Sequence, residues 1–256
     1  MASRNKRSEQ NQNTMLGKSK LFLFLCCIVL TSCIAPKKTS KELKVKEIKA
    51  DKNVTLVQVS KLLEEQAELQ TIDLINWNEF QYLPEVKFRI AHSNNQIWLK
   101  YYVKEKSILA EVIETNGGVA NDSCVEFFFD PLADGNYYNF EFNCIGVAHL
   151  AYGPGRNDRV FIAPEIIEKD VKVISSLGNI PFSEQTGDYT WEMTVIIPGS
   201  SLTHNKGLQL KGLSTRANFY KCGNKTAESH YVSWNRALTE RPDFHRPEYF
   251  GNLIFE

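Results

Sequence analysis

The strongest constraint on the fold is a pair of alternating segments within residues 121–144, NDSCVEFFFDPLADGNYYNFEFNC. Successive residues of a strand point to opposite faces, so the alternation of side chains fixes how two such segments pair. The register that places the apolar side chains on one face predicts a β-hairpin with residues 131–136 as its loop. Its apolar face pairs Val125 with Phe142, Phe127 with Phe140 and Phe129 with Tyr138.

The same register sets two carboxylates against each other on the opposite face of the hairpin. Glu126 is predicted to lie directly across from Glu141, with Asn139 and Asn143 on the same face. Like charges directly across a ladder destabilise it by up to about 1 kcal/mol. We therefore expect this polar face to serve something other than stability.

Alternation also dominates the rest of the chain. Residues 85–92 and 97–106 predict a second hairpin around Ser93-Asn94-Asn95-Gln96. Near the start of this region, residues 54–59 are compatible with a strand, and Ser60 with the cap of a short helix. Further alternating segments cover residues 190–199, 208–221, 230–234 and 249–255. The pattern predicts an all-β antiparallel β-sandwich with one or two short helices, in a single domain over residues 54–256.

The N-terminal region carries an addressing signal. Lys18 and Lys20 precede the apolar run LFLFLCCIVL at residues 21–30. This run is about half of the roughly 20 residues that a spanning helix needs, which predicts a signal peptide over residues 1–32. Met15 would begin a signal of more usual length than Met1 does.

The signal is followed by a candidate lipid anchor. The sequence Leu-Thr-Ser-Cys ending at Cys33 resembles the lipobox of bacterial lipoproteins, which implies that this cysteine is lipidated. An ordinary secretory signal is the alternative. Residues 33–53 are polar and rich in lysine, so we expect them to form a tether.

Charge and cysteine content exclude several classes of protein. Lys plus Arg and Asp plus Glu number 30 each, so no basic surplus indicates a nucleic-acid partner. Beyond Cys33, only Cys124, Cys144 and Cys222 remain, which is not a disulfide framework. Cys124 and Cys144 point to opposite faces in the predicted register, so no bond between them is expected. No C-x-x-C pattern or Cys/His cluster predicts a zinc site.

Five segments, DSCVEFFFDP, YYNFEFNCIG, RANFYKCG, SWN and PDFHRPEYFGNLIF, resemble the family 9 carbohydrate-binding modules. The likeness covers roughly residues 70–256 and is to the version common in lipoproteins of glycan-degrading Bacteroidetes. It implies a jelly-roll-like β-sandwich that binds sugars without cleaving them, often near a chain end. It also allows structural calcium ions, although no other cofactor is expected.

The resemblance assigns roles to individual residues. Glu126 matches the family's ligand-bonding carboxylate, and Asn143 matches a binding amide. Phe244 falls where better-studied members have one of two stacking tryptophans, so an aromatic ring is kept there. Glu141 falls where those members have an arginine.

The chain departs from the family pattern at the second stacking tryptophan, where it has Val119-Ala120. That change puts a two-sided aromatic clamp in doubt. Trp234 lies on an adjoining segment, where packing and stacking are both open.

We hypothesise that Glu126 and Glu141 accept hydrogen bonds from sugar hydroxyls while Arg89 or Arg246 neutralises them. A nearby cation would lower the pKa of the carboxyl groups, whereas burial and mutual repulsion would raise at least one of them.

Two alternatives, one enzymatic and one redox, stay open. A carboxylate pair such as Glu126 and Glu141 also suits a retaining glycosidase acting on O-glycosyl bonds. A haem module would need axial ligands from the histidines, because Met193 alternates with Trp191 and Val195 on an apolar side. The histidines beyond the signal are His92, His149, His204, His230 and His245.

The spacing of Asp130 and Asp134 favours an ordinary turn over a calcium site.

The sequence as a whole predicts a non-catalytic glycan-binding lipoprotein of the bacterial cell envelope. Its lipid would hold it at the outer membrane, facing the periplasm or the surface. An oligosaccharide or polysaccharide is the expected ligand, with glycan-degrading enzymes as neighbours.

Overall fold

The computed structural model describes residues 40–256. The predicted signal peptide and the lipidation of Cys33 lie outside these residues. Within the part that is described, no helix is long and apolar enough to cross a membrane.

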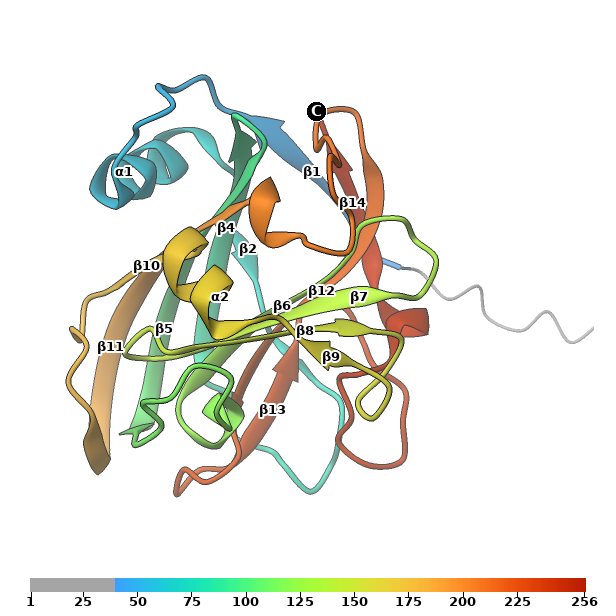
Figure 1. Ribbon diagram of the computed structural model, residues 1–256. Coiled ribbons are helices and arrows are strands. Elements are labelled where there is room, and N and C mark those ends of the chain that lie inside the picture. Colours follow the sequence, from blue (N-terminus) through green and yellow to red (C-terminus); the bar gives the residue numbers. More distant parts are fainter. Residues whose placement is uncertain (1–39) are drawn as a thin grey trace, which may run out of the picture. The chain divides into compact units, whose positions relative to one another are not determined.

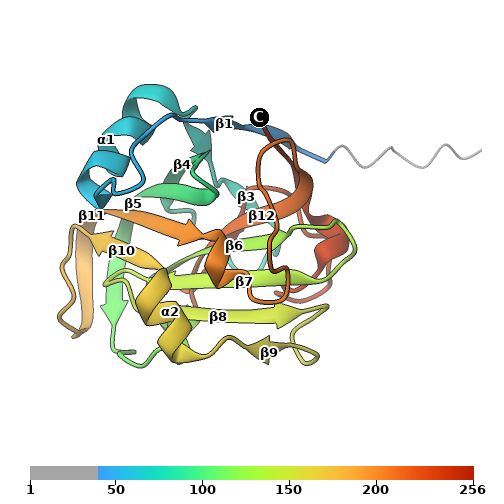
Figure 2. The ribbon, with the colours of Figure 1, turned by 45° about the horizontal axis from the view of Figure 1, so that its top comes forward.

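The described residues form one curled 14-stranded sheet whose two halves face each other (Figures 1 and 2). The first half, here called the first sheet, contains β3 (Leu74–Ile75), β6 (Cys124–Asp130), β7 (Tyr137–Asn143), β8 (Ala148–Gly153), β9 (Val160–Phe161), β12 (Ser214–Gly223), β13 (His230–Ser233) and β14 (Gly251–Phe255). The second sheet contains β2 (Gln70–Thr71), β4 (Glu85–Ser93), β5 (Gln96–Ala110), β10 (Lys172–Ser175) and β11 (Phe182–Pro198). In Figure 2, β6, β7 and β8 run side by side in the first sheet.

The strand pairs within both sheets are antiparallel, as the sequence predicts. The exception is β1 (Glu42–Glu47), which pairs in parallel with β14 of the first sheet and with β4 of the second. The all-β sandwich is therefore confirmed, with β1 joining its two halves.

The position of β1 corrects the expectation that residues 33–53 form a tether. Leu43 and Val45 are 5% and 0% exposed, whereas the lysines between and beyond them point outward. Lysine-rich composition concealed the alternation in ELKVKE, which is that of a strand with one buried face. Any tether that precedes the domain ends before Glu42.

The region from residue 54 also differs from the prediction, because it begins a helix and not a strand. Thr55 caps α1 (Leu56–Gln66) in a reciprocal capping box with Gln58, so Ser60 is not the cap. Val59 and Leu63 are buried from this helix, and they pack in one cluster with Trp98 of β5. Tertiary packing thus overrides the β propensity of the valines.

A second helix, α2 (Pro164–Asp170), begins with proline at its first turn and buries Ile167. Three short 3-10 helices complete the regular structure, at Val119–Asn121, Gly199–Ser201 and Pro247–Tyr249.

The predicted hairpin between residues 85 and 106 is present. Asn94 and Asn95 connect β4 to β5 with φ angles of 49° and 60°, the positive values that a two-residue turn of type I′ requires. The expected strand over residues 208–221 starts later, at Ser214, because Gly212 turns the chain just before it.

Two hydrophobic cores contact the first sheet, one on each face. The core between the sheets includes Phe127 and Phe140 of the hairpin, and Phe88 of β4 stacks on Phe219 of β12 with ring centroids 3.9 Å apart. Met193 lies in this core, as alternation predicts. The second core lies on the outer face of the first sheet, where loop residues cover the strands. It consists of Trp77, Val119, Cys124, Phe128, Tyr137, Tyr220, Cys222, Ala237, Phe244 and Phe250.

Candidate functional site

The predicted register of the hairpin is confirmed, and Glu126 lies directly across from Glu141 on the outer face of β6 and β7. The two carboxylates are not on an open sheet, however, because their residues are only 3% and 6% exposed. The loops that build the second core also cover this end of the strands. A carboxylate pair is therefore buried at the edge of a core.

A cavity of about 170 Å³ reaches both carboxylates. Its floor is formed by the outer face of β6, β7, β8 and β12, and its walls come from the loops around residues 117–120, 156–159 and 242–245. The lining residues are Gly117, Gly118, Ala120, Glu126, Glu141, His149, Arg156, Arg159, Cys222, Asn224, Tyr231, Pro242, Asp243, Phe244 and His245. We call this hollow the site cavity.

Glu126 is the deeper member of the pair. The Cys222 thiol donates a hydrogen bond of 2.9 Å to its Oε1. Burial raises the pKa of Glu126 well above its usual range, and the neighbouring Cys222 and Glu141 raise this pKa further. The protonated, uncharged carboxyl is thereby favoured. This outcome agrees with the expectation that burial and repulsion raise the pKa of at least one of the two.

Glu141 keeps polar partners of its own. Asn139 donates a hydrogen bond of 2.8 Å to its Oε1, and Arg159 Nη1 lies 3.9 Å from the same oxygen. The second arginine of the cavity, Arg156, forms an ion pair of 3.0 Å with Asp243. The cations near the carboxylates are thus Arg156 and Arg159.

These arginines come from the loop between β8 and β9, whose sequence GPGRNDR folds tightly back on itself. A Cβ atom at Gly153 would lie 2.3 Å from the carbonyl oxygen of Asp158 and 2.6 Å from Cα of Arg159. Only glycine permits this approach, which brings Arg159 over the outer face of the sheet.

Two histidines line the site cavity in different ways. His149 lies across from Glu141 on β8, and its Nδ1 is 3.1 Å from the carbonyl oxygen of Gly117, so Nδ1 carries the proton of that contact. Its Nε2 is buried and has no hydrogen-bond partner among residues 40–256. His245 contacts the Tyr137 hydroxyl at 2.8 Å, and burial, aided by Arg156 and Arg159, lowers its pKa to about 2.

The structure brings only some of the predicted site residues to this cavity. Phe244 lines it, although one face of its ring is stacked on Tyr220 with centroids 4.0 Å apart. Asn143 does not line it, because its amide is fully buried. That amide donates to the carbonyl oxygen of Val112 and to Asp122 Oδ2 at 2.8 and 2.9 Å. We conclude that Asn143 holds a neighbouring loop in place.

The two arginines predicted to neutralise the carboxylates lie elsewhere, which corrects that hypothesis. Arg89 belongs to the second sheet, where it donates to the Tyr102 hydroxyl and to the backbone of Ala67. The side chain of Arg246 is half-exposed and pairs with Glu248. Neither arginine is the cation beside the carboxylate pair.

Trp234 also lies away from the site cavity, since it is 1% exposed in the core between the sheets. Its ring packs closely on Gly251, where a Cβ atom would lie 2.3 Å from Cζ3 of the indole. Packing is therefore the role that the structure gives this residue.

Sequence reasoning missed the two arginines of the cavity, and it considered His149 and His245 only as haem ligands. The alternating segment AHLAYG at residues 148–153 was not predicted as a strand, and pairing it with β7 would have set His149 beside Glu141. The arginines carried no comparable signal, because they lie in an irregular loop.

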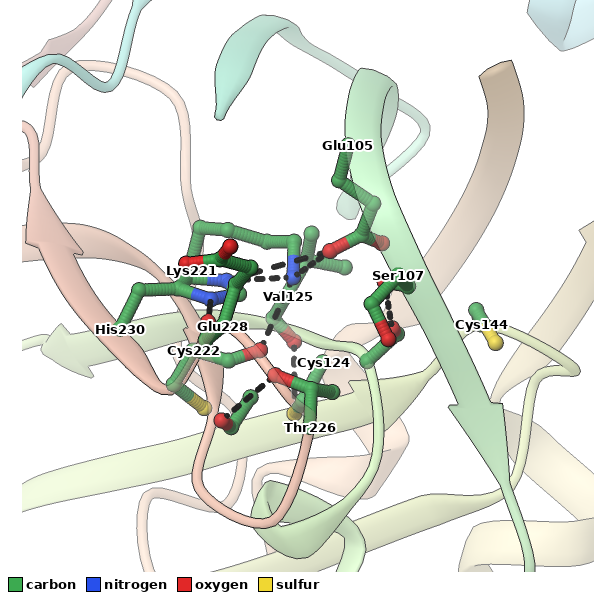
Figure 3. A network of polar contacts seen from close by, with 12 residues as sticks. Glu105, Ser107, Cys124, Val125, Cys144, Lys221, Cys222, Thr226, Glu228 and His230 are labelled. Atoms are coloured by element: carbon green, nitrogen blue, oxygen red, sulfur yellow. Dashed lines mark hydrogen bonds and ion pairs between the residues drawn. The ribbon is translucent and has the colours of Figure 1, made fainter. Parts of the chain in front are cut away.

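A buried ion pair lies on the other face of β12, next to the cavity residue Cys222. Lys221 Nζ is 2.7 Å from Glu105 Oε2 and 2.9 Å from both His230 Nε2 and the carbonyl oxygen of Cys222. Figure 3 shows this ammonium group between Glu105 of β5 and His230 of β13. The ammonium hydrogen-bonds to two of these partners and is ion-paired with the third, so its charge is balanced inside the protein and we assign this group a structural role.

Asp130 behaves as the turn residue that the sequence favours. Its carboxylate accepts hydrogen bonds from the backbone N–H groups of Asp134 and Gly135 in the hairpin loop. These contacts are those of a capped turn.

Comparison with known proteins agrees with this geometry. Residues 57–255 match Carbohydrate-binding family 9. The chain belongs to this family. A crystal structure from Bacteroides uniformis ATCC 8492, of a protein to which carbohydrate binding is ascribed, shares 40% sequence identity at a TM-score of 0.82. The match covers 85% of this chain and all of that one. Among curated proteins, none matches the chain.

More distant members of family 9 share the fold. A module from Caldicellulosiruptor kristjanssonii in complex with glucose aligns at a TM-score of 0.54 with 11% identity, over 84% of this chain and 96% of that one. Its complex with cellotriose aligns at 0.50 with 13% identity, over 84% and 94% of the two chains. At such identities the likeness establishes the fold, so the role of each cavity residue rests on the geometry above.

Proposed function

We propose that the site cavity binds carbohydrate without cleaving it. The observation that carries this proposal is the set of hydrogen-bonding groups that converge on a small hollow beside aromatic side chains. Glu141 and the unpartnered Nε2 of His149 suit hydroxyl donors, while Arg156 and Arg159 supply N–H groups. A sugar hydroxyl both donates and accepts, so it can use both kinds of group.

The size of the cavity favours a single sugar ring. Sites for drug-sized ligands measure about 300 to 1,000 Å³, whereas this one has about 170 Å³. The side chains of Phe244 and Tyr231 line the cavity and provide the apolar contact that the C–H surface of a ring requires. We propose that one sugar ring lies inside the site cavity and that the rest of the glycan lies outside it.

Family membership supports the same ligand class, because the related Caldicellulosiruptor kristjanssonii module is solved with glucose and with cellotriose. Binding to a family 9 module of this kind is expected to be weak, with a Kd between about 1 μM and 1 mM. The panel for a first test therefore includes glucose and cello-oligosaccharides beside other neutral and acidic glycans.

Glu141→Gln tests the site. We expect glycan affinity to fall roughly 10- to 100-fold, because a hydrogen bond to a charged group contributes about 1.5 to 3 kcal/mol. Titration calorimetry of the whole chain against the best panel glycan measures the change. Glu65→Gln, which removes an exposed carboxylate of α1, is the matched control and should bind as the wild type does. Equal affinity of wild type and Glu141→Gln would refute the assignment.

One observation favours the alternative hypothesis, that Glu126 and Glu141 are the catalytic carboxyl groups of a glycosidase. Glu126 is buried with a raised pKa, a property that general acids of such enzymes share. The binding proposal predicts that each panel glycan is recovered intact after prolonged incubation. Release of shorter products by the wild type, and their loss in Glu126→Gln, would establish the enzyme instead.

We further propose that a lipid on Cys33 anchors the protein in the bacterial cell envelope, where it supports capture or degradation of polysaccharides. The basic flank, apolar run and small residues before Cys33 support this anchor. With β1 beginning at Glu42, only about eight residues separate the lipid from the domain, so the sheet would lie close to the membrane.

Cys33→Ala tests the anchor. We expect the wild type to incorporate labelled fatty acid and to sediment with the envelope, and the variant to do neither. Fractionation followed by immunoblotting measures this. A variant that remains labelled would contradict lipidation at this residue.

A further inference from the structure

Two cysteines that are far apart in the sequence meet on the outer face of the first sheet. Cys124 on β6 lies directly across from Cys222 on β12, and Glu126 follows two residues after Cys124 on the same face. The two sulfur atoms and a Glu126 oxygen all lie within 4.8 Å of one another. In the part of the chain that the structure describes, this is the one group of three such ligands. Both cysteines appear among the sticks of Figure 3.

We propose that Cys124, Cys222 and Glu126 form a binding site for one thiophilic divalent cation, with Zn²⁺ as the natural candidate. Two thiolates and one carboxylate are ligands that Zn²⁺ accepts in a tetrahedral arrangement. Strands place all three without any change in backbone pairing. A fourth position, for water or another small ligand, faces the site cavity, because Cys222 and Glu126 both line it.

The surroundings fit such an ion in two respects. The site cavity gives it a route from solvent to ligands that are otherwise buried. Three anionic ligands around a divalent ion leave one net negative charge, and Arg156 on the cavity wall is placed to offset it. Binding exchanges the thiol and carboxyl protons for the ion, and no oxidation or reduction is involved.

The third cysteine provides an internal contrast. Cys144 lies in the core between the two sheets, and its thiol contacts the carbonyl oxygen of Leu109 at 3.5 Å. It has no part in the ligand group, so it represents a cysteine used for packing. Cys124 and Cys222 differ because a carboxylate and a cavity adjoin them.

A metal at this site would hold Glu126, which also faces the proposed sugar. The metal-site proposal does not depend on sugar binding. A negative result for either proposal would leave the other unaffected. Occupancy by Zn²⁺ would nevertheless change the shape and charge of the cavity floor.

Titration of the reduced, chelator-treated whole chain with Co²⁺, a spectroscopic substitute for Zn²⁺, tests the site. We expect one equivalent of Co²⁺ to produce thiolate-to-cobalt absorption that Zn²⁺ then removes. Cys124→Ser and Cys222→Ser should abolish this absorption, and the matched control Cys144→Ser should retain it. Glu126→Gln should weaken Zn²⁺ binding by about tenfold or more, because even the loss of a residue that only hydrogen-bonds to a metal ligand lowers metal affinity by that factor.

Three results would overturn the proposal. One is the lack of thiolate-to-cobalt absorption in the reduced wild type, a readout that does not depend on any variant folding. Another is unchanged absorption in Cys222→Ser. The third is a disulfide between Cys124 and Cys222 in the protein as isolated, detected by peptide mapping without reductant.

Discussion

Two groups of buried ionisable side chains lie on opposite faces of β12 and its neighbours, and they are built on opposite principles. Lys221 points between the sheets, where it is ion-paired with Glu105 and hydrogen-bonds to His230 and a backbone carbonyl. The next residue, Cys222, points outward to Glu126, which faces Glu141 across the ladder. The first group balances its charges within the protein. The second sets two carboxyl groups of like charge side by side at a cavity.

The difference separates a structural group from a functional one. A buried pair of opposite charges is already balanced, so a ligand gains little from contacting it, whereas a pair of carboxylates gains from any partner that donates hydrogen bonds or carries positive charge. Both groups are buried to a similar degree, so burial by itself does not distinguish them. The balance of charge within each group does.

The largest expected effect is on stability, from Lys221→Met. Removing the ammonium leaves the Glu105 carboxylate buried without its counter-charge, although Trp191 still donates to it. Breaking a buried pair in this way costs about 3 to 5 kcal/mol of unfolding free energy. Denaturant unfolding followed by tryptophan fluorescence measures the loss.

The double variant Lys221→Met with Glu105→Gln controls for the uncompensated charge. It should recover a substantial part of the lost stability, because no charge then remains buried. If Lys221→Met unfolds at the wild-type denaturant concentration, the structural role of this group is wrong and the comparison fails.

A smaller effect, of opposite sign, is expected from Glu126→Gln. The folded-state pKa of Glu126 is raised, so between the unfolded-state pKa near 4.3 and that higher value the native protein binds more protons than the unfolded chain. Wild-type stability therefore falls as pH rises through this window. The variant lacks this loss, so we expect it to be more stable than the wild type at neutral pH.

Unfolding free energies of wild type and Glu126→Gln at a series of pH values from about 4 to about 8 would measure this difference. The two curves should lie close together at the acidic end and separate as pH rises. Parallel curves would show that the pKa of Glu126 is the same in the folded and the unfolded protein. The contrast with Lys221 would then be wrong.

The sequence by itself determined the hairpin and its consequences. The period of two in VEFFFD and YYNFEF sends the phenylalanines to one face, and a slip by one residue would expose them all. That constraint is local and strong, so alternation alone is enough to set the register, the facing carboxylates and the sandwich class. The family resemblance added the ligand class that the alternation could not supply.

Only the tertiary structure decided what covers that carboxylate pair and which cations approach it. Arg156 and Arg159 reach the pair from an irregular loop, and Cys222 reaches Glu126 from a strand almost a hundred residues away. Such contacts depend on how loops and distant strands pack, and no periodicity in the sequence encodes that packing. For β1 the alternation is present in the sequence, and only the tertiary structure decided that it pairs in parallel with β14 and β4.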